Sequence, residues 1–106
     1  MLQRPALYRL APILLLGWIS GCVTSPPVQE MSDARQAIMA AEAANAEEYA
    51  ATTLADARRF LDMAEQLIED EVYGPARMNA VRARNRATRA LEIAQAAAES
   101  ATEADD

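Results

Sequence analysis

The sequence predicts an all-α fold, and three observations lead to this prediction. Alanine and the other strong helix formers make up almost all of residues 28–100. Within that region the apolar residues recur at alternating steps of three and four, which is the spacing of one helix face. Gly74-Pro75 is the strongest break in the region. We therefore expect an antiparallel hairpin of two helices preceded by a shorter N-terminal helix, in a tetratricopeptide-like or three-helix arrangement.

The first predicted helix runs from about Val28 to about Asn45. Four residues at steps of three, four and three share its inner face: Met31, Ala34, Ile38 and Ala41. The pattern then loses register over residues 46–51. Thr52 or Thr53 can cap a new helix, because a threonine hydroxyl accepts a hydrogen bond from the first free backbone N–H groups.

The second predicted helix continues to about Val72. Its inner positions again alternate at steps of three and four: Leu54, Ala57, Leu61, Ala64 and Ile68. Glycine suits the position just past a helix end and proline suits the first turn of the next helix. The pair Gly74-Pro75 therefore predicts a tight turn here.

The third predicted helix starts at this turn and runs to about Ser100. Its inner positions are all alanine, in a heptad-like pattern typical of a coiled coil: Ala76, Ala80, Ala83, Ala87, Ala90, Ala94 and Ala97. The whole helical domain is thus expected over residues 28–100. The acidic tail at 101–106 is expected to be disordered.

A register test favours an antiparallel pairing of the second and third helices. When the chain folds back, each larger residue of the second helix meets an alanine of the third. Large-against-small pairing allows two helix axes to approach to about 8 Å. The same register predicts that Glu65 faces Arg82 and that Asp62 faces Arg86.

The N-terminal segment has the features of a secretory signal. Arg4 and Arg9 precede an apolar stretch of about ten residues, which is too short to span a bilayer that needs about twenty. Ile19-Ser20-Gly21-Cys22 resembles a bacterial lipobox. We expect residues 1–21 to be removed by cleavage between Gly21 and Cys22.

The resemblance to bacterial lipoproteins implies that Cys22 carries acyl chains such as palmitate and anchors the chain to a membrane. Two or more chains give stable attachment. Residues 22–27 then form the lipidated cysteine and a proline-rich linker. Val23 follows the cysteine where an aspartate would favour retention at the inner membrane. The implied location is the outer membrane, with the helical domain facing the periplasm.

Charge and composition exclude several functions. The chain has a formal net charge of −6, which argues against nucleic acid or an anionic membrane surface as the main partner. It contains no histidine, and its only cysteine is Cys22. No nucleophile–base pair and no glycine-rich phosphate loop is present. We therefore expect no enzyme activity and no cofactor.

Two clusters of charged residues are candidate binding sites. Asp62, Glu65 and Glu69 share a helix face, but calcium sites draw six or more oxygens from a bent loop, so a solvated face is expected and no metal. A second group follows the third helix as a stripe: Arg82, Arg86 and Arg89. Arginine forks bind carboxylates and phosphates, so this stripe predicts docking of an acidic partner. The alternative is pairing with the second helix.

The order of landmarks resembles the bacterial lipoproteins of the domain-of-unknown-function 4398 family. The resemblance rests on the following residues: Cys22, Ala40-Ala41-Glu42-Ala43-Ala44, Glu48-Tyr49-Ala50, Leu54, Ala57-Arg58, Leu61, Ala64, Tyr73, Ala76, Ala80 and Ala83. This chain departs from the pattern in lacking lysine and in the presence of Gly74-Pro75 after Tyr73. The resemblance implies a helical, non-catalytic envelope lipoprotein, often associated with outer-membrane-protein-A-like peptidoglycan-binding domains.

Together these observations predict an envelope docking or structural module, accessory to an outer-membrane or peptidoglycan-binding protein. One alternative is direct, non-covalent binding of peptidoglycan. Another is self-assembly of the chain into a helical spacer, because small domains often rely on oligomerisation. The expected partners are thus a membrane through the lipid on Cys22, an envelope protein, peptidoglycan or a second copy.

Overall fold

A computed structural model describes residues 25–105, and it confirms the all-α prediction for this part of the chain. Its elements are α1 (Val28–Ala43), α2 (Ala46–Tyr49), α3 (Ala51–Glu69) and α4 (Tyr73–Asp105). The expected leader at 1–21 and the lipobox cysteine Cys22 lie outside the described residues. Among the described helices, none combines the length and the apolar character that crossing a membrane requires.

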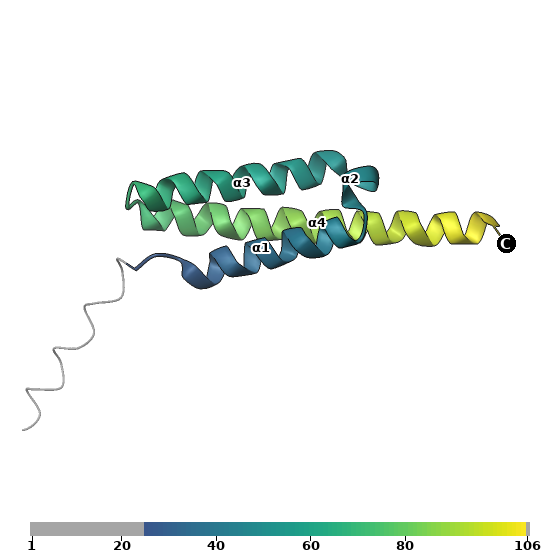
Figure 1. Ribbon diagram of the computed structural model, residues 1–106, viewed down its shortest axis with the longest axis horizontal. Helices are drawn as coiled ribbons and strands as arrows, with labels where there is room; N and C mark the ends of the chain where they lie inside the picture. Colours follow the sequence, from purple (N-terminus) through teal and green to yellow (C-terminus); the bar gives the residue numbers. More distant parts are fainter. Residues whose placement is uncertain (1–24, 106) are drawn as a thin grey trace, which may run out of the picture.

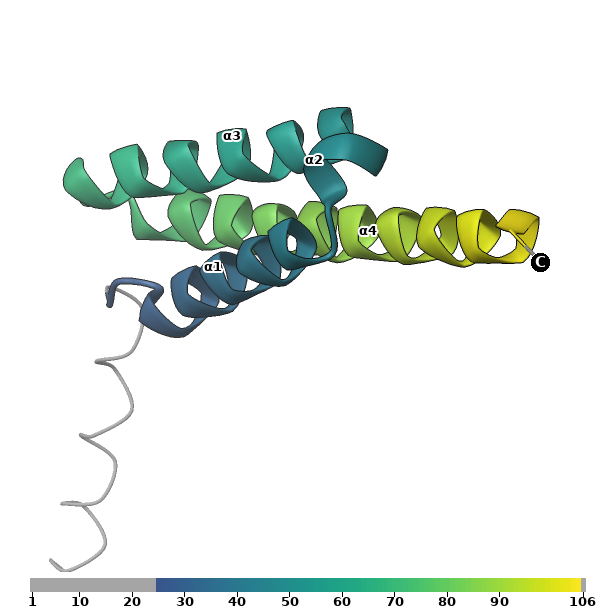
Figure 2. The same ribbon diagram turned by 45° about the vertical axis from the view of Figure 1, so that its right-hand side comes forward.

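The long helix α4 organises the other helices. α3 lies beside α4 and runs in the opposite direction, and α1 also packs along α4 (Figure 1). The end of α4 continues beyond α2 as a single helix, drawn in yellow, and the second view shows the same arrangement (Figure 2). The body of the domain is therefore built on the first two-thirds of α4.

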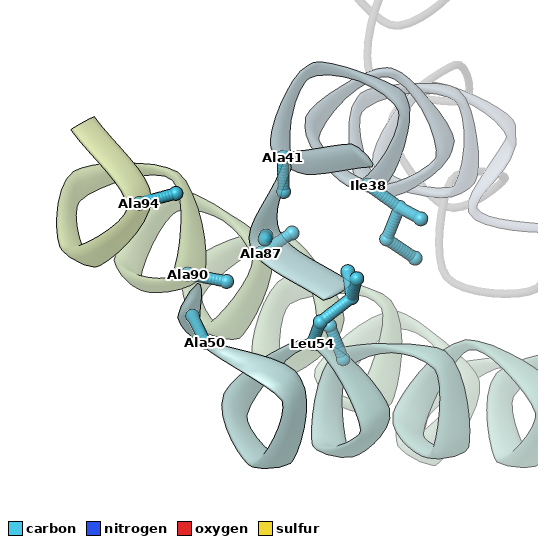
Figure 3. Close-up of a cluster of buried hydrophobic side chains, with 9 residues drawn as sticks. Ile38, Ala41, Ala50, Leu54, Ala87, Ala90 and Ala94 are labelled. Carbon is cyan, nitrogen blue, oxygen red and sulfur yellow. The ribbon is translucent and has the colours of Figure 1, made fainter. Parts of the chain in front are cut away.

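The core is thin because it is made mostly of alanine. Along α4 the buried face carries Ala76, Asn79, Ala80, Ala83, Ala87, Ala90 and Ala94. Among residues 25–105, Leu54 and Pro27 are the only large side chains that are fully buried. Leu54 lies among residues of α1 and α4, with Ile38 and Ala87 near it (Figure 3). Alanine allows the helix axes to approach closely, so the domain gains contacts without much apolar volume.

The break after α1 lies where the apolar pattern loses register. α1 ends at Ala43, and Asn45 then adopts a left-handed backbone conformation with φ 63°. Asparagine tolerates this conformation better than most residues. The expected threonine cap is wrong: Ala50 precedes α3, and no side chain accepts a cap hydrogen bond there. The N-terminus of α3 is set by the short helix α2, whose Ala46 carbonyl accepts the Ala50 N–H.

The turn between α3 and α4 differs from the predicted turn. Glu71, rather than a glycine, takes the left-handed position, with φ 61°. The Glu71 N–H donates to Ile68 O at 3.0 Å and the Val72 N–H donates to Leu67 O at 2.8 Å. This pair of bonds is the Schellman ending of a helix. α4 already begins at Tyr73, so Gly74 and Pro75 lie in its first turn, where proline fits without a helix break.

The expected disordered tail is also corrected. α4 remains helical through Asp105, although its last residues are exposed. The Thr102 hydroxyl donates to Ala98 O at 3.0 Å, which satisfies the polar group within the helix. The segment is rich in alanine and glutamate, both strong helix formers, so the helix continues without a covering neighbour.

Candidate docking surface

Most of the exposed arginines within residues 25–105 lie on α4. Arg82, Arg84 and Arg86 have exposed side chains. Within residues 25–105, no carboxylate lies within 4.0 Å of any of these three guanidinium groups. Arginine presents five N–H donors in a planar fork, so these side chains can bind carboxylates or phosphates from outside the domain.

The predicted pairs across α3 and α4 are wrong. Glu65 Oε1 accepts a hydrogen bond from Arg35 of α1 at 3.2 Å, and Glu65 forms no ion pair with Arg82. Asp62 and Arg86 are both exposed and form no ion pair with each other. The reason is that α1 supplies the arginine on that side of α3, which a register test between only two helices cannot reveal.

The other arginines tie the helices together. Arg77 of α4 bonds Glu30 of α1 at 3.0 Å, with both side chains partly buried. Arg58 of α3 pairs with Glu42 at 3.2 Å and also with Glu47 of α2. Glu47 and then Glu42 raise the pKa of Arg58 above its ordinary value. Since that value already lies far above neutral pH, Arg58 stays charged and holds α1 and α2 against α3.

The three residues predicted as a stripe do share one exposed side of α4. We call Arg82, Arg86 and Arg89 the arginine stripe. Steps of four and three residues place them on one helix face, and all three are exposed. Of the three, only Arg89 has an ion-pair partner in the described part of the chain: Glu92 of the same helix, at 3.4 Å. The structure thus separates the arginines that pair between helices, Arg35, Arg58 and Arg77, from the exposed arginines of α4.

Sequence reasoning missed the acidic continuation of this face. Because α4 does not stop near Ser100, Glu99 and Glu103 remain on a regular helix and are exposed. The signal was present in the sequence as an unbroken spacing of three and four residues from Arg82 to Glu103. The arginine stripe is therefore one half of a longer charged face.

The acidic residues of α3 do not assemble into a metal site. Glu65 is engaged with Arg35, and Asp62 and Glu69 are exposed on the helix surface. In the part of the chain that the structure describes, no group of three or more metal-ligating side chains stands together. A straight helix does not bring carboxylate oxygens around a single point.

These features define a small all-α domain with a row of exposed arginines on one long helix. The chain matches the family described as Domain of unknown function (DUF4398) over residues 29–106, and it belongs to that family. The family resemblance inferred from the sequence is therefore confirmed. No curated protein and no solved structure matches the chain significantly.

Proposed function

We propose that this protein is a non-catalytic lipoprotein of the bacterial envelope whose helical body docks an acidic partner in the periplasm. The observation that carries the proposal is the arginine stripe, in which Arg82 and Arg86 are exposed and form no ion pair within residues 25–105. The fold uses Arg35, Arg58 and Arg77 for its own contacts. The stripe is left for contacts with another molecule.

The anchor in this proposal is the lipid on Cys22, after cleavage that follows Gly21. Val23 favours the outer membrane. Five residues separate Cys22 from Val28, the first residue of α1, and these six steps along the chain span at most about 20 Å. The bond between Glu30 and Arg77 ties the start of α1 to the start of α4. The start of α4 then lies near the membrane.

In the same proposal, α3 and α4 act as a helical hairpin stiffened by the shorter helix α1. The three-helix arrangement is favoured over a tetratricopeptide-like unit because Met31, Ala64 and Ala80 form one buried cluster drawn from α1, α3 and α4. A rigid scaffold of this kind suits docking, because side chains on a well-packed helix lose little freedom on binding.

The favoured partner is an acidic segment of an envelope protein, such as an accessory outer-membrane or peptidoglycan-binding protein. A guanidinium binds a carboxylate through two parallel hydrogen bonds, which gives both affinity and orientation. The net charge of −6 makes an anionic lipid surface a poor partner for the body of the protein. Peptidoglycan stem peptides also carry carboxylates and form the alternative ligand.

A photocrosslinking probe in place of Arg86 tests the docking surface in cells. We expect one discrete adduct with an envelope protein, identified by mass spectrometry. The matched control is the same probe in place of Glu48, an exposed residue of α2, which should give no such adduct. Equal adducts from both positions, or none from either, would contradict docking through the stripe. Sedimentation of the chain with cell-wall sacculi, lost in Arg82→Glu/Arg86→Glu, would instead favour peptidoglycan.

The lipid anchor has its own test. Cells grown with an alkyne-tagged palmitate should label the wild-type chain, and Cys22→Ala should lose all of that label, because it removes the thiol that would receive the lipid. The same variant should leave the outer-membrane fraction. As a control, Ser25→Ala, three residues further along, should keep the label. Labelled Cys22→Ala protein would rule out this cysteine as the anchor.

A further inference from the structure

The charges of α4 are divided between its two halves. Exposed arginines stand at Arg82, Arg84, Arg86 and Arg89. Exposed acidic residues follow them on the same helix: Glu92, Glu99, Glu103 and Asp105. This division gives α4 a positive first half and a negative second half along its exposed surface.

The stability of α4 alone does not explain this division. Helix dipoles favour acidic residues near the N-terminus and basic residues near the C-terminus, the reverse of what α4 has. Glu99 and Glu103 are four residues apart, a spacing at which like charges repel on a helix. The acidic half therefore gains from positive charges that another molecule supplies.

The exposed face of α4 follows a regular pattern. Steps of three and four residues connect its members, all of them exposed: Arg82, Asn85, Arg89, Glu92, Ala96, Glu99 and Glu103. We call these seven residues the outer stripe. Past Ala94, the last buried residue of α4, no other described helix covers it (Figure 2). The second half of α4 is thus an unpartnered helix with a heptad-like face.

We infer that a second copy of this chain packs antiparallel on the outer stripe, centred near Ala94 of each copy. In this register Arg89 lies opposite Glu99 of the second copy, and Asn85 lies opposite Glu103. The two-fold symmetry repeats both pairs, so each positive half meets a negative half. The overlap covers residues 82–105, a length of about 36 Å at the rise of an α-helix.

This inference rests on the proposed function, because it takes the arginine stripe as a docking surface and names its acidic partner. Exposed ion pairs are individually weak and are screened by salt. The pairing is therefore weak for dilute protein and depends on ionic strength. An anchor that holds copies on one membrane raises their effective concentration and favours the pairing without any new contact. Small Ala96 near the symmetry axis leaves room for the helices to approach.

Charge exchange between Arg89 and Glu99 tests the inference on the full chain. Two copies with different affinity tags, one of them carrying a photocrosslinking probe in place of Asn85, are expressed together and irradiated in the cells. The membranes are then extracted in mild detergent, and capture through one tag is followed by detection of the other. Wild-type copies should be captured together. Arg89→Glu with itself and Glu99→Arg with itself should each lose at least about tenfold of the captured copy. In both variants, like charges face each other twice.

The decisive measurement is made on cells that express the two single variants together. An Arg89→Glu copy with a Glu99→Arg copy, and the double variant with itself, should both regain wild-type capture, because each opposed pair is again of unlike charge. Arg84→Glu, an exposed arginine outside the outer stripe, is the matched control and should leave capture unchanged. Circular dichroism should show that all variants keep their helix content.

Other results would overturn the antiparallel pair. Wild-type copies that are never captured together show that the chain does not pair. Capture that survives both single variants shows pairing through another surface. Loss in the single variants without recovery in the mixture shows that the charges meet a different molecule. In that last case a discrete adduct from the Arg86 probe would keep the proposed function, whereas its absence would end both.

Discussion

Replacing Leu54 by alanine is expected to lower the free energy of unfolding by about 2–5 kcal/mol, the usual cost of removing a buried leucine side chain. Leu54 is 1% exposed and lies between α1, α3 and α4, in contact with a cluster that includes Ile38, Ala87 and Ala90 (Figure 3). Its neighbours are mostly alanines, which are too short to fill the space that the substitution leaves. Ile38 is the other large buried side chain of this cluster, and it belongs to α1.

Urea unfolding followed by circular dichroism measures this effect on residues 25–106. Met39→Ala is the matched control, because Met39 is 66% exposed on α1 and should change the free energy of unfolding by no more than about 0.5 kcal/mol. Similar midpoints for the two variants would show that Leu54 is not the anchor of the core. A variant at Leu54 that is unfolded without urea would agree with the prediction.

The buried faces could be predicted from the sequence because their spacing is regular. All four predicted inner residues of the first helix are buried, and Leu54, Ala57 and Ala64 are buried in α3. Leu61 and Ile68 are only half-buried but pack against the core. Alanine at steps of three and four identifies a face in α3 and in the first part of α4, where most of the other positions are polar or charged.

The helix ends could not be predicted with the same accuracy. The left-handed conformation falls on Glu71, although Gly74 is the residue that adopts it most easily. A left-handed glutamate costs about 1–2 kcal/mol, which packing of α3 on α4 offsets. The caps at Thr52 and Thr53 fail for a similar reason, since α2 determines where α3 begins. Backbone and capping preferences of about 1–2 kcal/mol are therefore outweighed by contacts between helices.

The docking surface could be predicted only in part. The positions of Arg82, Arg86 and Arg89 on one face follow from their spacing alone. Their lack of partners from α3 depends on α1, whose Arg35 pairs with Glu65. The spacing of apolar residues does not predict which side of α3 the helix α1 packs against. The acidic half of the outer stripe was missed because the alanine-rich end of α4 was expected to fray.

The second large effect concerns the alanine seam of α4. Ala87→Leu is expected to lower the free energy of unfolding by about 3 kcal/mol, the upper end of the cost of overfilling a packed core. Ala87 is fully buried in the same cluster as Leu54 and Ile38. A leucine there has no free volume to enter, so it must push α3 or α1 away from α4. The apolar area that it adds does not compensate, because the helices lose contact along their length.

The matched control for this change is Ala98→Leu on the same helix. Ala98 is exposed on the uncovered end of α4, so the substitution changes neither packing nor helix propensity by much. Urea midpoints should fall strongly for Ala87→Leu and stay near wild type for Ala98→Leu. Equal midpoints would mean that α1 and α3 do not hold α4 closely through alanine. A strong fall for Ala87→Leu alone would show the opposite. Small residues on the buried face of α4 would then be what allows α1 and α3 to pack closely on it.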